Sequence, residues 1–151
     1  MEDFAKYILN EDDFISKIEI LYFLAPKLGI NFDKSIVFKT EIARMFLEYS
    51  KLNVDENLVL TACLLCNCKK VDDAQKIGQL KTYAKEGAEY LVKLGFDERF
   101  CRICEGVNRY SGLSPREKES DIIELADQFG GLLMDRPERI GFSPDEALVL
   151  I

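Results

Sequence analysis

Apolar residues recur at the spacing of an α-helix along most of the chain, and this periodicity limits the fold more than any other feature of the sequence. The first apolar stripe is formed by Ile18, Leu21, Tyr22 and Ala25. Further stripes of the same spacing are Phe38, Ile42, Met45, Phe46 and Tyr49; then Tyr83, Gly87, Tyr90, Leu91 and Leu94; then Ile122, Leu125, Ala126, Phe129 and Leu133. No segment shows the alternation of a β-strand, so the sequence predicts an all-α fold.

Capping and turn residues divide the periodic segments into helices. Ser114–Glu117 and Ser143–Glu146 both have the pattern of a capping box with proline at the first helical position. Pro26 is expected to end or kink a helix near Leu24. Helix ends are also expected at Gly29, Gly95, Gly112 and Gly141, which follow apolar stripes. The expected helices cover residues 2–9, 11–28, 33–51, 55–67, 80–94, 97–110, 115–133 and 144–151, with a loop at 68–79.

Length and charge bound the class of protein. The chain has 151 residues, of which 48% are hydrophobic and 31% charged, as in one ordinary globular domain. The sequence thus predicts a single-domain bundle of about seven to eight helices. A net charge of −7 opposes binding to nucleic acids and to anionic membranes. The acidic start of the chain differs from a signal peptide and no apolar run approaches the ~20 residues of a membrane span, so we expect a cytoplasmic protein.

The chain contains no histidine. This excludes Ser-His-Asp and Cys-His nucleophilic sites in their usual form, and it excludes histidine-based zinc or iron centres. Catalysis through Asp, Glu, Lys or Tyr stays open, although the commonest proton shuttle is missing.

The cysteines form the most conspicuous candidate for a metal site. Cys63 and Cys66, and likewise Cys101 and Cys104, are spaced as Cys-x2-Cys pairs, and Cys68 lies between the pairs. This spacing is typical of a four-thiolate zinc site. Both pairs lie in predicted helices with apolar neighbours, where a reduced cysteine packs as a small hydrophobic residue. Core packing is the favoured interpretation, and a zinc or redox sensor is the alternative.

Several segments, taken in order, resemble one family. They are Lys85–Leu91 with Leu94–Phe96, Asn108–Gly112, Leu125–Phe129, Asp135–Arg139 and Ser143–Leu148. Together they make residues 33–151 similar to bacterial-type HD domains, and within that superfamily most similar to the HD-GYP cyclic di-GMP phosphodiesterases. The resemblance implies an HD-like domain over 33–151, on which the helices of residues 1–32 pack or form a cap within one structural unit.

The resemblance implies a metal-binding site that this chain has lost. Members of the family hydrolyse phosphodiesters with two or three metal ions held by histidine and aspartate. The positions that match those ligands are Phe38, Cys66, Asn67, Tyr83, Gly106, Val107 and Asp127, of which only Asp127 is retained. The Gly-Tyr-Pro motif is absent, and the loop that carries it is shortened to residues 113–120. The resemblance therefore implies no bound cofactor and no hydrolysis by the family mechanism.

The expected function is that of a catalytically inactive HD-GYP-like domain, which acts in signalling as a protein-interaction module through a protein partner or as a homodimer. The aromatic N-terminal helices are one candidate dimer interface. A first alternative is a receptor that binds a cyclic dinucleotide without cutting it, with Lys70, Arg109 and Arg136 facing the phosphates. The cysteine-based sensor is the second alternative, and residual metal-dependent hydrolysis is the third.

Overall fold

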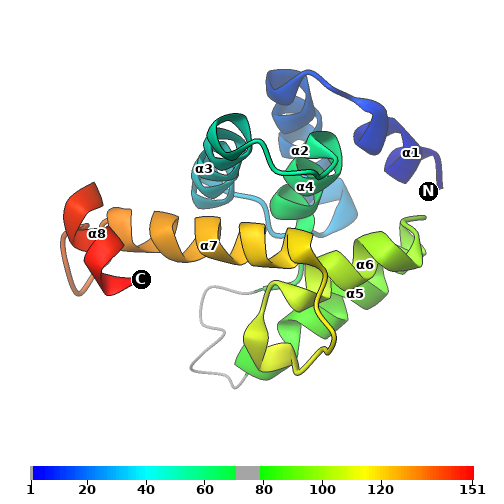
Figure 1. Ribbon diagram of the computed structural model, residues 1–151. Helices are drawn as coiled ribbons and strands as arrows, with labels where there is room; N and C mark the ends of the chain where they lie inside the picture. The colour runs from blue at the N-terminus through cyan, green and yellow to red at the C-terminus, as the bar shows by residue number, and fades with distance from the viewer. Residues whose placement is uncertain (1, 71–78) are drawn as a thin grey trace.

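The protein is an all-α bundle in the computed structural model, which describes residues 2–70 and 79–151 (Figure 1). The described chain forms eight α-helices and two short 3-10 helices and contains no β-strand. The α-helices are α1 (Glu2–Asn10), α2 (Phe14–Leu28), α3 (Lys34–Ser50), α4 (Glu56–Leu65), α5 (Tyr83–Lys93), α6 (Glu98–Gly106), α7 (Lys118–Leu133) and α8 (Pro144–Leu150). The 3-10 helices are η1 (Gln79–Lys81) and η2 (Arg109–Ser111). The predicted fold class is confirmed.

Helix α4 lies at the centre of the bundle. All residues from Val59 to Leu65 are buried, because α1, α3, α6 and α7 surround this helix. Its start is fixed by Asp55, whose carboxylate accepts a hydrogen bond from the backbone N–H of Leu58 at 3.2 Å. Asp33 and Asp97 cap α3 and α6 in the same way. Aspartate at these positions satisfies backbone N–H groups that the first turn of a helix leaves free.

The N-terminal helices pack on the bundle and share its core. Ala5 and Ile8 of α1 and Leu21 of α2 are buried in the same cluster as α4. The ring of Phe4 meets the edge of Phe96, with centroids 6.1 Å apart. Four large apolar side chains of these helices stay exposed, namely Tyr7, Ile15, Tyr22 and Phe23.

Some predicted helix boundaries are wrong. The Ser143–Glu146 capping box is present, but Ser114 begins no helix, because α7 starts at Lys118 with Glu117 as its cap. The segment before α7 is held instead by Arg102, whose guanidinium donates to the carbonyl of Pro115 at 2.8 Å. Helix α6 ends at Gly106, and the separate turn η2 follows it, where one longer helix was expected.

Proline and glycine signals were correct in part. Pro26 does not end α2, which continues to Leu28. Gly29 adopts a left-handed conformation directly after α2, as expected. Gly141 follows no helix, and it lies where a Cβ atom would come 2.1 Å from the carbonyl oxygen of Leu133. The predicted loop at 68–79 falls mainly outside the described residues, and its last residue, Gln79, begins η1.

In the part of the chain that the structure describes, no helix is long and apolar enough to cross a membrane.

A buried lysine connects the first helices to α4. Lys17 of α2 is 1% exposed, and its ammonium donates to the side-chain oxygens of Asn57 and Thr61. The Asn57 amide in turn donates to the backbone carbonyl of Leu9, and this hydrogen bond connects the end of α1 to α4. Burial lowers the pKa of Lys17 to about 8, because the charged form loses hydration there.

Lys17 should therefore make stability depend on pH. The folded-state pKa lies below the value of about 10.4 in an unfolded chain. The unfolded state thus binds more protons between these values, and the contribution of Lys17 to the free energy of unfolding rises with pH in that range. We expect wild type to gain about 3 kcal/mol relative to Lys17→Met between pH 7 and pH 10.5, measured by urea unfolding. Parallel pH profiles of the two proteins would contradict this assignment.

Candidate functional site

The structure brings most of the sequence-predicted site residues to one polar hollow of about 370 Å³ beside α7. Predicted residues that line it are Asn67, Lys70, Tyr83, Val107, Arg109 and Asp127. They come from the turn after α4, the start of α5, the end of α6, η2 and the middle of α7. Segments far apart in the sequence therefore converge here because α4, α6 and α7 pack together.

Asp127 is the one carboxylate among the aligned ligand positions, and it is ion-paired. The ammonium of Lys39 on α3 lies 2.8 Å from Asp127 Oδ1, with side chains 15% and 37% exposed respectively. The sequence marked Asp127 as the one retained position of the resemblance, but its partner Lys39 was missed. The only sign of Lys39 in the sequence is its place directly after Phe38, the first position that the resemblance matches to a metal ligand. The pair leaves Asp127 with a cation that already neutralises it.

Glu124 is a second residue that sequence reasoning missed. It lies one turn before Asp127 on α7, and its buried carboxylate accepts from Arg116 at 3.0 Å and pairs with Arg109 at 2.5 Å. The hollow is thus lined by two cations, Lys70 and Arg109, and by two carboxylates, Glu124 and Asp127. Lys39 and Arg116 also pair with these two carboxylates, so cations outnumber carboxylates around the hollow and the excess positive charge disfavours a metal cation there.

Tyr83 and Val107 close the inner wall of the hollow with buried side chains. Burial raises the pKa of the Tyr83 phenol, and the nearby Cys66 and Asp127 add to that effect. Tyr83 thus stays protonated and uncharged at neutral pH. The ammonium of Lys70 lies 5.3 Å from the centre of the Tyr83 ring, a cation–π arrangement that also occupies this cation.

Four predicted site residues lie outside the hollow. Phe38 is 40% exposed on α3 and lines an apolar groove instead, because the helix turns its ring away from Asp127. Cys66 is buried behind the hollow. Gly106 packs against α7, where a Cβ atom would lie 2.8 Å from Ser120 Oγ. Arg136 lines an adjoining hollow of about 320 Å³ and donates to the carbonyl of Gly131 at 3.4 Å, so it helps to satisfy the end of α7.

All five cysteines are buried and free. Burial raises the pKa of Cys63 and Cys68 to about 12 and that of Cys101 to about 11, and it holds the pKa values of Cys66 and Cys104 well above the ordinary range. A thiol must ionise before it binds zinc or attacks a disulfide, so this environment favours the packing interpretation. Among the described residues, no group of three or more His, Cys, Asp or Glu side chains is placed to hold a metal ion.

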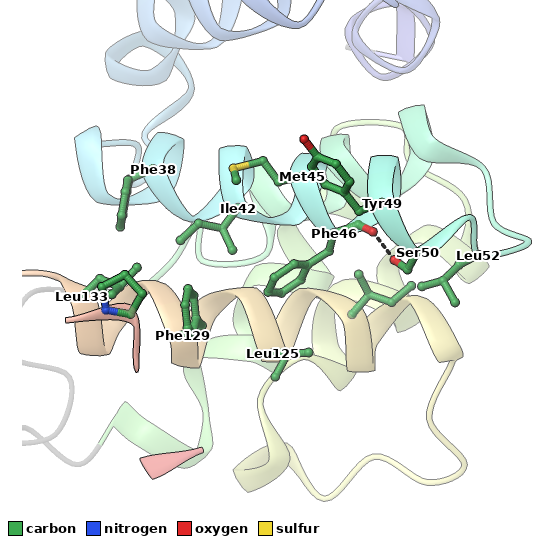
Figure 2. A pocket seen from close by; sticks show the side chains of 12 residues that line it. Phe38, Ile42, Met45, Phe46, Tyr49, Ser50, Leu52, Leu125, Phe129 and Leu133 are labelled. Atoms are coloured by element: carbon green, nitrogen blue, oxygen red, sulfur yellow. Dashed lines mark hydrogen bonds between the residues drawn. The ribbon is translucent and has the colours of Figure 1, made fainter. Parts of the chain in front are cut away.

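The opposite side of α7 forms, together with α3, an apolar groove of about 880 Å³ (Figure 2). Its floor contains Phe46 and Phe129, whose ring centres are 6.3 Å apart, and Ile42. The sides of the groove are formed by exposed side chains of both helices, such as Met45 of α3, which is 46% exposed, and Leu125 of α7, which is 42% exposed. The full lining is Phe38, Ile42, Met45, Phe46, Tyr49, Ser50, Leu52, Ile122, Leu125, Phe129, Leu133 and Pro144.

None of the lining side chains of the groove carries a charge at neutral pH. The groove is formed by two of the apolar stripes identified in the sequence, at residues 38–49 and 122–133. The structure shows that the two stripes face each other but leave their outer edges open (Figure 2). Contiguous apolar surfaces on monomeric soluble proteins often mark interaction sites.

Comparisons with models of protein families, with curated proteins and with solved structures found no match for this chain.

Gly130 allows α3 and α7 to approach closely enough for the Lys39–Asp127 pair. A Cβ atom at Gly130 would lie 2.8 Å from Lys39 Cγ and 3.1 Å from Ile42 Cδ1, whereas one at Gly131 would meet only the mobile end of Arg136 at 3.0 Å. Alanine gains up to ~1 kcal/mol of helix propensity at either position. We expect Gly131→Ala to be neutral or stabilising, and Gly130→Ala to destabilise by about 1–3 kcal/mol through overpacking, as measured by urea unfolding. Equal stability of the two variants would contradict this role of Gly130.

Proposed function

We propose that the protein is a catalytically inactive HD-like domain that acts as a protein-interaction module, and that it docks through the apolar groove between α3 and α7. The observation that carries the proposal is the groove itself, about 880 Å³ in volume, lined by side chains without charge and open along both helices. Desolvation of exposed apolar side chains is the main source of free energy in protein association.

The state of the polar hollow supports the inactive part of the proposal. Metal-assisted phosphodiester hydrolysis needs several ionised or imidazole ligands around the ions. At the aligned positions the chain offers a protonated Tyr83, a neutral Asn67, the apolar Val107 and an Asp127 paired with Lys39. Such a set gives little compensation for dehydrating a divalent cation.

The experiment that tests the docking role is photo-cross-linking in cells that produce the protein. The cross-linking amino acid p-benzoylphenylalanine replaces Tyr49, which is 80% exposed at the edge of the groove, and in the control it replaces Tyr22 on α2, which is 65% exposed. We expect a discrete protein adduct from position 49 that is absent from position 22. The adduct should be lost when Leu125→Glu is added in the same chain and should persist when Ile15→Glu is added, since Ile15 is exposed outside the groove.

Two results would contradict the proposed function. One is the absence of a discrete adduct at position 49. The other is an adduct that Leu125→Glu leaves unchanged, because binding would then not depend on the groove.

A further inference from the structure

We infer that the hollow at the end of α7 binds a doubly charged oxyanion of the phosphate class, either free phosphate or the phosphate group of a monoester. Figure 1 shows this end of α7 beside α8, and the hollow there has a volume of about 320 Å³. This volume is at the lower end of those of small-molecule sites. The inference goes beyond the proposed function, since the hollow shares no lining residue with the apolar groove.

Positive charge is in excess in this hollow. The charged side chains of its lining are four cations, Lys39, Lys70, Arg136 and Arg139, and one carboxylate, Asp127. Asp127 pairs with Lys39 at 2.8 Å and so neutralises one of these cations. In the part of the chain that the structure describes, none of the other three cations forms an ion pair. The chain as a whole carries a net charge of −7, so the sign of the charge is reversed locally, as in a cleft that attracts a small anion.

A tight turn holds the two arginines opposite each other. The backbones of Arg136 and Arg139 exchange two hydrogen bonds, with N–O distances of 2.8 and 3.1 Å, across the turn formed by residues 137–138. Side chains of such a directly opposed pair leave on the same face, with Cβ atoms about 4.5–5.5 Å apart. The carboxylate of Asp135 accepts from the backbone N–H of Gly141 at 2.6 Å and closes the turn. The spacing of the two side chains is therefore set before a ligand binds, which lowers the entropic cost of binding.

Backbone carbonyls orient both guanidiniums without neutralising them. Arg136 Nη2 and Arg139 Nη2 donate to the carbonyl of Gly131 at 3.4 and 3.2 Å, and Arg139 Nη1 donates to the carbonyl of Met134 at 3.3 Å. The free carbonyls at the end of a helix carry the equivalent of about half a negative charge, so most of the positive charge of the two arginines is left. A guanidinium presents five N–H groups in a planar fork that matches two oxygens of a phosphate.

Two lysines add donors from other elements. The ammonium of Lys39 on α3 gives one hydrogen bond to Asp127 Oδ1 and has further N–H groups for a ligand. The ammonium of Lys70, after α4, lies 5.3 Å from the centre of the Tyr83 ring, a neutral partner that leaves its charge in place. Lysine and arginine side chains from three parts of the chain therefore line the same hollow.

The size of the charge excess favours a dianion over a monoanion. Free phosphate and phosphate monoesters carry about 1.5 to 2 negative charges at pH 7, whereas a phosphodiester carries one. Because the Coulomb energy grows with the charge of the ligand, the hollow gains more free energy from the dianion. The inferred site thus differs from a receptor for cyclic dinucleotides, whose phosphates are all diesters.

Isothermal titration calorimetry of the purified full-length chain with inorganic phosphate, at neutral pH and low ionic strength, tests the inference. We expect saturable binding at one site with a dissociation constant of about 1 mM or lower. Arg136→Gln and Lys70→Gln should each raise the dissociation constant at least about 10-fold, because each removes a charge-assisted hydrogen bond. Lys93→Gln on α5 is the matched control and should leave binding unchanged, since Lys93 is exposed and lines neither polar hollow.

Two further ligands test the class of anion. Dimethyl phosphate, a singly charged diester, should bind at least about 5-fold more weakly than inorganic phosphate. Glycerol 3-phosphate, a monoester, separates the two sources of the dianion. Tighter binding of the monoester assigns the site to an organic phosphate, and tighter binding of inorganic phosphate assigns it to the free ion. Either order supports the inference.

Folding of the variants is checked by circular dichroism and thermal unfolding. Arg136 is exposed and Lys70 is half-buried, so glutamine at either position leaves the core intact, and either variant alone is sufficient if the other unfolds. A wild-type chain without saturable phosphate binding overturns the inference. Binding that is unchanged in the folded Arg136→Gln and Lys70→Gln variants overturns it as well, and so does dimethyl phosphate that binds as tightly as inorganic phosphate.

Discussion

The close packing of α7 against α3 is the contact on which both surfaces of the protein depend. Gly130 of α7 lies against Lys39 and Ile42 of α3, where a Cβ atom would come within 2.8 Å of Lys39 Cγ. The approach lets Phe46 meet Phe129 on one side of the contact and lets Lys39 reach Asp127 on the other. One helix pair thus carries an apolar groove on one side and borders a polar hollow with ion-paired carboxylates on the other.

The polar hollow and the apolar groove differ in the free energy that each can still gain by binding. In the hollow, both carboxylates are ion-paired with cations, Tyr83 stays protonated, and the thiol of Cys66 is buried. Little electrostatic free energy is left there to bind a metal cation. Along the groove, the apolar walls remain in contact with water and gain free energy when covered. This contrast is the physical reason for our proposal that the domain works by docking rather than by catalysis.

The sequence predicted the fold class and the main helices because apolar periodicity is a local property of the chain. It failed at Ser114, because a capping pattern is only a weak local preference, and α7 begins at Lys118 instead. Of the positions named from the resemblance, Asn67, Tyr83 and Asp127 line one hollow, whereas Phe38 and Gly106 do not. The resemblance could not supply Lys39 or Glu124, because ion pairs between helices depend on how those helices cross.

The sequence identified the apolar stripes but did not show how much of each stripe is exposed. Periodicity shows that Met45 on α3 and Leu125 on α7 each share a helix face with buried residues. It does not show how much of that face a neighbouring helix covers. Whether such a face is core or interface is decided only by tertiary packing. For the same reason the sequence placed a candidate dimer interface on the N-terminal helices, where Ile8 proves to be buried and Tyr22 exposed.

Elemental analysis of the purified protein tests most directly the central claim that packing has replaced a metal site. The protein is prepared under reducing conditions without chelator. The account predicts less than about a tenth of an equivalent of any transition metal, because the positions that the resemblance assigns to metal ligands hold neutral, apolar or ion-paired side chains. About one equivalent of zinc, or two of iron or manganese, would contradict it.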